Sequence, residues 1–372
     1  MTFNNETESN TISELKSLER HNSRSTIFVA MAVVLFLFSA TALAVTILYF
    51  TSNRVKDKSG ASFSEIPEVT YTREEVDRMI EDAVEMATEE TEAKTIDKMI
   101  HTFRNASEEP SGVLLLLRQY YPNSVVFQES SKFEYYPIYS TLKPNTIDIE
   151  NLVYDEGSGK MYYMEDGETV SSIAGVDVSS FQKDIDWVAV KNSGIEFAMI
   201  RCGFRGYGTG AIKEDTYFKQ NIEGALEAGL KVGVYFYTQA INIEEAIEEA
   251  EFTLELIAPY KIDYPVVIDI EEVNDTARTD DLDNTARSEI VRAFCDKVSA
   301  EGYTPMLYSN LKYLIKNLDL QVLDDIEKWF AYYNTTMYYP YEISMWQYSC
   351  SGVVDGIPGE VDINIGFKDW GK

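Results

Sequence analysis

The chain has 372 residues, enough for two or three domains of the usual size of ~100–200 residues. Its formal net charge of −30 argues against nucleic acid as a partner, because the phosphates would be repelled. Hydrophobic residues make up 45% of the chain and aromatic residues 13%, which indicates a substantial folded core.

The first predicted element is a membrane span at residues 27–50. This segment contains no charged residue and is flanked by Arg24 and Arg54. As a helix it is long enough to cross a hydrocarbon core of ~30 Å. A cleaved signal peptide is the alternative, since residues 42–44 resemble a cleavage site, but the apolar run continues beyond them. We therefore expect an uncleaved anchor that follows a short tail at 1–26.

Residues 51–110 read as a linker followed by an acidic stalk helix. Over 72–105 the pattern is helical, with Val76, Ile80 and Val84 on one stripe. The stretch is strongly acidic, which is typical of a solvated helix. The alternative is a coiled coil, through which the chain would self-associate.

Residues 111–173 change to a period near two, which predicts a small α+β spacer module. Strands are expected at 124–139 and 160–164, and residues 155–159 are typical of a hairpin turn. The residues of this module do not indicate a function.

Residues 174–372 alternate regularly between strand-like and helical runs. Strands are predicted at 174–179, 197–203, 231–238, 265–271, 304–310, 328–334 and 344–349, and helices at 185–193, 214–228, 243–258 and 285–301. Gly229 and Gly302 follow two of these helices, as C-terminal caps do. This alternation predicts an α/β fold, an irregular TIM-like β/α barrel. Because helical runs become scarce after residue 320, we expect loops between the last strands.

The most informative strand of the barrel is residues 265–271, because it is apolar yet ends in two acids. Strand side chains alternate between faces, so Asp269 and Glu271 project to the same side. Two carboxyls on one face of a buried strand are costly unless they are paired, hydrated or used. A glycoside hydrolase needs such a pair, one to protonate the leaving oxygen and one to stabilise positive charge at the sugar carbon.

The other predicted strand ends supply further candidates, since a β/α barrel carries its functional groups at the carboxyl ends of its strands. They are Asp177, Arg201, Tyr207 in a glycine-rich loop, Tyr235, Tyr237, Tyr308, Tyr332, Trp346, Gln347 and Asp362. Acids together with aromatic rings are typical of a carbohydrate cleft, although each ring is as easily a core residue. The chain has only His21 and His101, and its three cysteines lack metal-ligand spacing, so we expect neither a metal nor a cofactor in the barrel.

Several stretches of the C-terminal half carry a family resemblance. They are residues 175–182 (GVDVSSFQ), 197–203 (FAMIRCG), 215–221, 228–235 (AGLKVGVY), 267–271 (VIDIE), 346–348 (WQY) and 359–364 (GEVDIN). With these motifs in order, residues 174–370 resemble the family-25 glycoside hydrolases, the Chalaropsis-type lysozymes or N-acetylmuramidases. The resemblance implies an irregular β/α barrel that cleaves the β-1,4 bond between N-acetylmuramic acid and N-acetylglucosamine in peptidoglycan glycan strands.

The resemblance also implies roles for the acids. By position, Glu271 matches the general acid, and Asp269 matches the carboxylate that stabilises the transition state or an intermediate formed with the substrate's acetamido group. Asp177 and Asp362 match the other acids of the site. Substrate contacts are expected from Tyr237, Tyr207, Arg201, Tyr308, Trp346 and Gln347. Many relatives have a histidine where this chain has Phe236, which puts one peripheral sugar contact in doubt.

A substrate outside the cytoplasmic membrane predicts the topology. The tail 1–26 is expected in the cytoplasm and residues 51–372 outside, so that an anchored enzyme reaches the wall. Two alternatives remain, a non-catalytic glycan-binding or scaffold module of a cell-envelope complex and a hydrolase of a different glycan. The presence of all four acids favours catalysis, since a binding module does not need them.

Overall fold

The computed structural model describes residues 110–273 and 275–371, together with positions 78, 80, 84, 91 and 93–97. These isolated positions are helical and exposed, within the segment where the sequence predicts a stalk helix. Among the described residues, no helix is long and apolar enough to cross a membrane, and the span predicted at 27–50 lies outside them.

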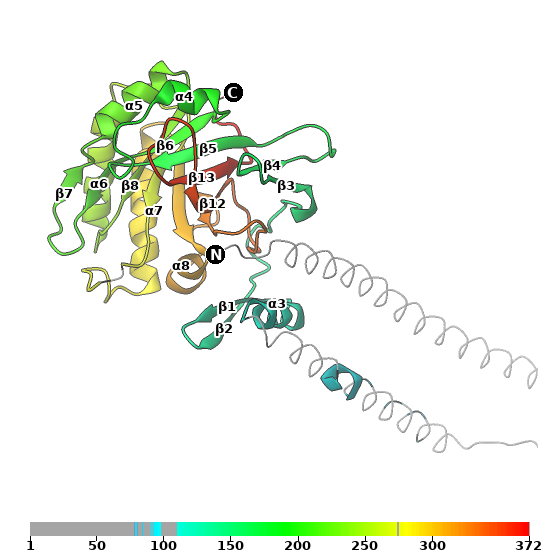
Figure 1. Cartoon of the computed structure of the whole chain (residues 1–372). Coiled ribbons are helices and arrows are strands. Elements are labelled where there is room, and N and C mark those ends of the chain that lie inside the picture. The colour runs from blue at the N-terminus through cyan, green and yellow to red at the C-terminus, as the bar shows by residue number, and fades with distance from the viewer. Residues whose placement is uncertain are drawn as a thin grey trace, which may run out of the picture. The chain divides into compact units, whose positions relative to one another are not determined.

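Eight strands form a closed barrel in the C-terminal half of the chain (Figure 1). They are β5 (Ile173–Val178), β6 (Phe197–Arg205), β8 (Lys231–Tyr237), β9 (Val266–Asp269), β10 (Pro305–Asn310), β11 (Glu327–Ala331), β12 (Met345–Gly352) and β13 (Val361–Gly366). Neighbouring strands from β5 to β12 run parallel, whereas β13 runs antiparallel to both β12 and β5. A short strand, β7 (Ile212–Glu214), extends the sheet beside β6. The predicted irregular β/α barrel is therefore confirmed.

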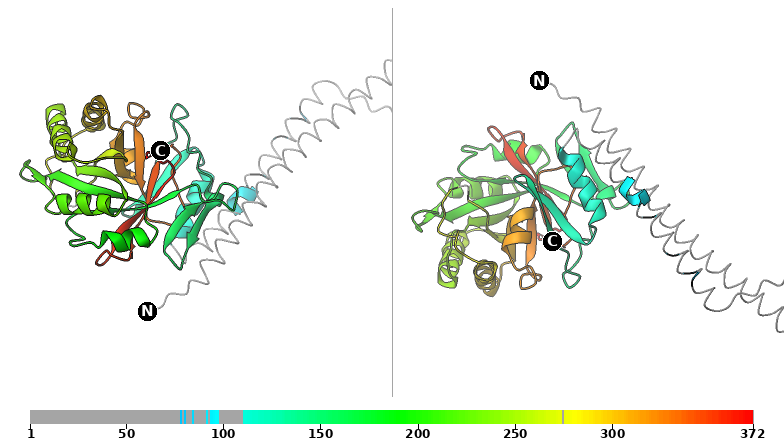
Figure 2. Two further views of the ribbon diagram at one scale, coloured as in Figure 1. Left: turned by 90° about the horizontal axis from the view of Figure 1, so that it is seen from above. Right: turned by 90° about the horizontal axis from the view of Figure 1, so that it is seen from below.

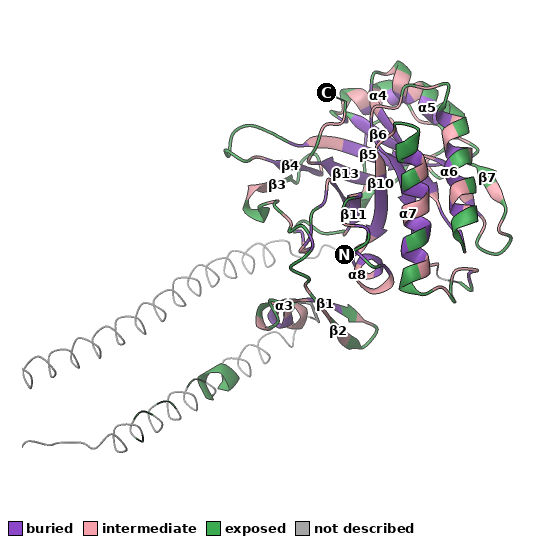
Figure 3. Cartoon of the chain, turned by 180° about the vertical axis from the view of Figure 1, so that it is seen from behind, coloured by how far each residue is buried: buried purple, intermediate pink, exposed green. Residues whose placement is uncertain are grey.

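Helices cover the outside of the first strands. They are α4 (Trp187–Asn192), α5 (Phe218–Glu227), α6 (Ile243–Ile257), α7 (Asn284–Ala300) and α8 (Leu311–Asn317). Figure 3 shows buried inner faces and exposed outer faces on α5 and α7, which contact β6 and β8, and β9 and β10, respectively. Four of the helices begin after an Asp or Asn whose side chain accepts a backbone N–H bond, namely Asp186, Asn242, Asp283 and Asn310. Gly229 and Gly302 have φ values of 77° and 86°, the left-handed conformation that ends a helix.

The last strands lack such a cover. In the described chain after α8 there is no further helix, and loops join β11, β12 and β13, as predicted. The sequence prediction did not include β13, although Val361, Ile363 and Ile365 alternate there with Asp362 and Asn364 as strand residues do. It also missed α8, whose seven residues are too few for a clear helical period.

Residues 110–172 occupy this uncovered side of the barrel. They form α3 (Pro110–Tyr120), β1 (Ser124–Glu129), β2 (Lys132–Pro137), a 3₁₀ turn η1 (Ile149–Asn151), β3 (Leu152–Asp155) and β4 (Lys160–Tyr163). The single strand predicted at 124–139 is instead the β1–β2 hairpin, which turns at Ser130. Figure 2 shows these cyan and teal elements grouped beside the orange and red strands of the barrel.

Backbone N–H groups of this segment donate hydrogen bonds to tyrosine hydroxyls of the barrel loops and of β12. Three such bonds are Val126 to Tyr338 at 2.9 Å, Tyr139 to Tyr341 at 3.0 Å and Met161 to Tyr348 at 3.0 Å. The side chains of Val125, Phe127 and Met161 are buried in the same apolar cluster as the outer face of the barrel. The segment that the sequence predicts as a spacer thus packs against the barrel and covers its helix-poor side.

Every second residue of a barrel strand points inward, and these side chains fill the interior of the barrel. A separate buried cluster contains Phe197, Met199, Tyr235, Tyr264, Val267, Met306, Tyr308, Trp329, Ala331 and Met345. The next inward positions toward the carboxyl ends of the parallel strands carry acids, amides and tyrosines instead. The apolar layer therefore forms the floor of a polar site.

Candidate active site

Four carboxyl groups gather at the carboxyl ends of the parallel strands. Asp177 lies on β5 opposite Asp362 of the antiparallel β13, and Asp269 ends β9, with Glu271 two residues further on. The charge of Asp362 raises the pKa of both Asp177 and Glu271, after the larger effect of burial, which places these groups close to one another. The structure thus brings together the four acids that the sequence singles out.

Two amide side chains hold Asp177 in place. Its Oδ2 accepts hydrogen bonds from Gln347 Nε2 at 2.7 Å and from Asn364 Nδ2 at 2.8 Å. Asn364 in turn accepts a bond from the indole N–H of Trp329 at 2.7 Å. An indole only donates, so this bond directs the amide oxygen of Asn364 to the indole and its NH₂ group to Asp177.

The hydroxyls of two tyrosines fix the second amide. Tyr308 and Tyr333 both donate to Gln347 Oε1, at 2.7 and 3.1 Å. That oxygen therefore accepts two hydrogen bonds, and the NH₂ group of Gln347 donates to Asp177. Asp177 is consequently positioned by a network of neutral donors, with no cation in contact with it among the described residues.

Burial raises the pKa of all four acids, because it disfavours the charged form. The pKa of Glu271 rises to about 7, by burial and then by the charge of Asp362, and that of Asp362 rises to about 6 by burial. For Asp177 and Asp269 the pKa lies well above the ordinary value, through burial first and neighbouring carboxylates second. The cluster therefore holds protons near neutral pH.

Asp269 has an additional property. It is only 5% exposed, and its Oδ1 is buried without a hydrogen-bond partner in the described structure. Buried polar atoms are nearly always bonded, so this carboxyl oxygen is available to a group from outside the protein, water or a ligand. In the strand register Asp269 faces Tyr237 of β8 and Tyr308 of β10. The orphaned oxygen belongs to the same inward-facing layer as these two rings.

Arg201 on β6 is the cation that acts on this cluster. Its guanidinium pairs with the buried Asp215, whose Oδ2 lies 2.7–2.8 Å away, and donates to Ser180 Oγ at 3.1 Å. Its charge lowers the pKa of Asp269, against the raising effects of burial and of the neighbouring acids. Arg201 therefore favours the ionised form of Asp269 without forming an ion pair with it.

Two of the predicted aromatic contacts belong to the site. Burial and then the charges of Asp269 and Glu271 raise the pKa of Tyr237, so its ring stands beside the acid pair. Tyr308 is 6% exposed and packs edge-on against Trp329 with ring centres 4.5 Å apart. Tyr308 thus forms part of the floor rather than an open face.

The other two predicted aromatic contacts are placed differently. Tyr207 is 45% exposed on the loop after β6, and among the described residues no hydrogen bond links its side chain to the acids. Trp346 is fully buried, and its indole N–H donates to the carbonyl of Tyr332 at 2.8 Å. Because Trp346 precedes the inward Gln347, it points out of the barrel, into the buried apolar cluster and away from the acids.

Sequence reasoning missed two residues of the site, Asn364 and Tyr333. Asn364 stands two residues after Asp362 on β13, so the alternation of a strand already places both on one face. Tyr333 follows the end of β11 in a loop, where no periodic pattern indicates direction. Among the described residues, no group of three or more His, Cys, Asp or Glu side chains is arranged to hold a metal ion.

This β/α barrel, with carboxyls clustered at its strand ends, resembles known proteins. Residues 176–357 match the model described as "Glycosyl hydrolases family 25". This C-terminal segment is therefore similar to that family, in keeping with the motifs.

Three relatives illustrate the similarity. The autolytic lysozyme of Clostridium acetobutylicum is 30% identical over 191 residues, which cover 51% of this chain and 54% of the relative. Lysozyme M1 of Streptomyces globisporus is 26% identical over 208 residues, 52% of this chain and 67% of the relative. The solved structure of the modular autolysin LytC from Streptococcus pneumoniae is 26% identical, covers 58% of this chain and 52% of that chain, and gives a TM-score of 0.47. The chain thus spans about half to two thirds of the length of these relatives.

Proposed function

We propose that the chain is a membrane-anchored peptidoglycan hydrolase that cleaves the β-1,4 bond between N-acetylmuramic acid and N-acetylglucosamine. The observation that carries the proposal is the acid pair at the end of β9. Asp269 and Glu271 lie among two further carboxyls, and none of the four forms an ion pair with a basic side chain among the described residues. The family of the barrel and the lysozymes among its relatives support this activity.

In this proposal Glu271 is the general acid. A carboxyl whose pKa is about 7 is about half protonated at neutral pH, so a large fraction of the protein has a proton to give to the leaving oxygen. Proton transfer to the glycosidic oxygen breaks the bond to the sugar carbon, which becomes positively charged. Burial against the apolar floor, with Asp362 nearby, produces this pKa.

Asp269 stabilises the positive charge that develops. Its ionised form would face the sugar carbon or the intermediate formed with the acetamido group, and either partner would satisfy the orphaned Oδ1. Arg201 favours that ionised form, and a developing cation favours it further. Asp177, held by Gln347 and Asn364, and Asp362 complete the acidic face toward the substrate.

Sugar contacts come from the groups around the acids. Tyr237 offers its ring beside the pair, while Tyr308 and Gln347 form the floor. Arg201 lies between the rings of Phe181 and Phe204, at 5.2 and 5.6 Å from their centres, and carries donors at the rim. The exposed Tyr207 extends the rim on its loop.

The anchor and topology belong to the same proposal. A charge-free segment at 27–50 would hold the protein in the cytoplasmic membrane with residues 1–26 inside and the barrel outside, where peptidoglycan lies. Alkylation of cysteines introduced at residues 5 and 60 in intact cells tests this orientation. With Cys350 replaced by Ser in both variants, labelling at 60 alone is expected, and labelling at 5 alone would contradict it.

The decisive test is Glu271→Gln in the full chain, with Glu272→Gln as the matched control. Glu272 is the exposed neighbour and pairs with Lys312 at 2.9 Å, so its loss should leave turnover nearly unchanged. Loss of the proton donor should reduce turnover by ~10²–10⁴-fold with the fold intact. Release of fragments from purified peptidoglycan measures both, and unchanged release by Glu271→Gln would refute the assignment.

Mass spectrometry of the products defines the bond. Muramic acid at the new reducing ends supports the proposed cleavage, whereas glucosamine ends indicate another hydrolase. No cleavage combined with retained glycan binding would support the non-catalytic binding or scaffold module instead.

A further inference from the structure

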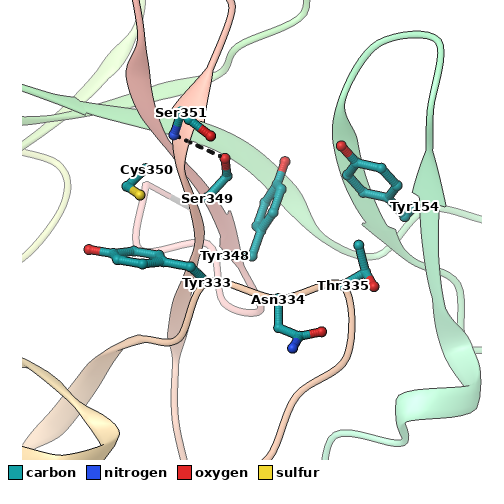
Figure 4. A pocket seen from close by; sticks show the side chains of 8 residues that line it. All are labelled: Tyr154, Tyr333, Asn334, Thr335, Tyr348, Ser349, Cys350 and Ser351. Carbon is teal, nitrogen blue, oxygen red and sulfur yellow. Dashed lines mark hydrogen bonds between the residues drawn. The ribbon is translucent and has the colours of Figure 1, made fainter. Parts of the chain in front are cut away.

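A pocket of about 230 Å³ opens between the β3–β4 hairpin and the barrel (Figure 4). Eight residues line it, from three segments: Tyr154 on β3, residues 333–335 after β11, and residues 348–351 on β12. Pockets for drug-sized ligands measure ~300–1,000 Å³, so this one suits a group of about one ring. Tyr154 lies outside the segment 176–357 that matches the family, so this wall is contributed by the N-terminal part of the chain.

The pocket continues the proposed active site. Tyr333 is common to both, because its ring lines the pocket and its hydroxyl donates to Gln347, which donates to Asp177. Cys350 in the pocket wall is influenced by Asp362, whose charge raises the pKa of the Cys350 thiol after the larger effect of burial. A chain of sugars leaving the acids along β12 would therefore reach the pocket directly.

The chemistry of the lining favours a neutral sugar. Three tyrosines, at 154, 333 and 348, provide aromatic surface, and Asn334, Thr335 and the serines at 349 and 351 provide neutral hydrogen-bonding groups. None of the eight lining residues is an acid or a base. A peptide stem with free carboxylates or amines would find no charge partner here, whereas an N-acetylated sugar ring presents one apolar face and hydroxyls at its edge.

Hydrogen bonds fix the hairpin that brings Tyr154 to the pocket. The hydroxyl of Tyr348 accepts the N–H of Met161 at 3.0 Å and donates to the carbonyl of Gly159 at 3.3 Å. Met161 is the cross-strand partner of Tyr154. The barrel strand β12 therefore sets the position of the Tyr154 ring, which is 41% exposed and free to stack on a ligand.

We infer that the N-terminal segment supplies a further subsite of the cleft, in which Tyr154 stacks on a neutral N-acetylated sugar ring of the bound glycan strand. The inference rests on the proposed function and deepens it. It makes residues 110–172 part of the substrate-binding surface, with Tyr154 and Tyr333 as opposite walls of one subsite.

The test uses peptide-free oligosaccharides of alternating N-acetylglucosamine and N-acetylmuramic acid in a series of lengths. The full chain in detergent and its Tyr154→Ala variant are compared by kcat/KM on each length. Loss of one stacking contact should lower kcat/KM by about 3- to 10-fold on substrates long enough to reach the pocket, and leave the shortest cleaved substrate unaffected. Tyr154→Phe, which keeps the ring, should retain most of the activity.

Tyr139→Ala is the matched control. Tyr139 is 48% exposed in the same N-terminal segment, bonds the barrel through its backbone N–H and does not line the pocket. It should behave as wild type on every length. An equal loss on all lengths for Tyr154→Ala, or no loss on any, would overturn the subsite, whereas a wild-type chain that cleaves none of the substrates would overturn the proposed function.

Cys350 gives an independent binding measurement. It is the exposed thiol of the three cysteines, since Cys202 and Cys295 are buried. In the Glu271→Gln variant, the long peptide-free oligosaccharide should slow alkylation of Cys350 by a maleimide. Adding Tyr154→Ala should raise this alkylation rate toward the rate measured with the shortest oligosaccharide. Protection by muropeptides alone, with none by peptide-free glycan, would refute a sugar as the occupant.

Discussion

Two clusters of polar side chains that contain buried carboxyls differ in how the carboxyl oxygens are satisfied. Behind the barrel wall, Glu249 of α6 is fully buried, and both oxygens accept bonds, from Arg205 Nε at 2.7 Å and from Thr238 Oγ1 at 2.6 Å. In the cleft, Asp269 is equally enclosed, yet its Oδ1 accepts nothing. One cluster is closed by its own neighbours and the other is open toward a ligand.

The pKa values alone do not separate the two clusters. Burial raises the pKa of Glu249 to about 7, against the lowering effects of Thr238 and Arg205, and the pKa of Glu271 also lies at about 7. The cleft differs in that several acids lie close together and Asp269 Oδ1 has no hydrogen-bond partner among the described residues. A perturbed acid therefore points to chemistry only when its surroundings leave a bond to be made.

The largest expected contrast is between Asp269→Asn and Glu249→Gln. Asp269→Asn removes the charge that faces the reaction and should lower kcat by ~10²–10³-fold, with the free energy of unfolding retained or increased. Glu249→Gln should keep most of the activity and lose stability, since an amide cannot accept from both Arg205 and Thr238. Activity on peptidoglycan and urea unfolding at pH 7 measure the pair. Equal losses of activity in both variants would erase the distinction between the clusters.

Removal of the cation from the closed cluster should have the next largest effect. Arg205→Met leaves Glu249 buried without its partner, which should cost about 3–5 kcal/mol of the free energy of unfolding. Arg292→Met is the control, since Arg292 pairs with the exposed Asp325 on the surface and its loss should cost ~0–1 kcal/mol. The midpoints of urea unfolding, at an unchanged dependence of the free energy of unfolding on urea concentration, give both costs. A cost below that of the control would mean that Arg205 does not compensate Glu249.

The sequence predicts the open cluster better than the closed one, for a physical reason. Asp269 and Glu271 are two residues apart at the end of one predicted strand, so the alternation of faces alone predicts that they lie together, and the other strand ends supply Asp177 and Asp362. Glu249 and Arg205 are brought together by the packing of α6 on β6, and no local pattern encodes that contact.

The same limit applies to the fold. Regular alternation predicts β5, β6, β8 to β12 and the helices α4 to α7, because each of these elements carries its own period. The packing of residues 110–172 on the helix-poor side depends on contacts about 200 residues apart, such as Val126 with Tyr338, which the sequence does not display. The outward direction of Trp346 has a related cause, since the inward face of β12 is fixed by its register with β11 and β13.

The pH dependence should separate the clusters by a smaller effect. As the proposed general acid, Glu271 must be protonated to act, so kcat/KM should fall as pH rises through about 7, up to tenfold per pH unit. Because the pKa of Glu271 is higher in the folded than in the unfolded chain, protonation of Glu271 contributes to the free energy of unfolding. This contribution is complete below the unfolded-state pKa of ~4.5 and is lost as pH rises through 7. Glu271→Gln should therefore lose less stability than wild type between pH 5 and 8. The charge of Asp362 raises the pKa of Glu271, so Asp362→Asn should shift the fall of kcat/KM to lower pH. If the fall stayed at the same pH in this variant, it would reflect the titration of another group.

The smallest expected effect comes from single hydroxyls, one in each cluster. Tyr333→Phe removes one of the two bonds to Gln347 Oε1, and Tyr308 retains the other, so the amide should stay oriented toward Asp177. A net hydrogen bond contributes about 0.5–1.5 kcal/mol, which corresponds to a loss of ~2- to 10-fold in kcat/KM.

Thr238→Val is the counterpart in the closed cluster. It leaves a buried oxygen of Glu249 without a donor, so the free energy of unfolding should fall by about 1–3 kcal/mol. Thermal unfolding and turnover, measured for both variants, show whether each hydroxyl contributes to stability or to activity. If Tyr333→Phe lost stability as Thr238→Val does, the open cluster would also be held together by its own bonds. Retained stability with reduced turnover would show that the network around Asp177 serves the substrate.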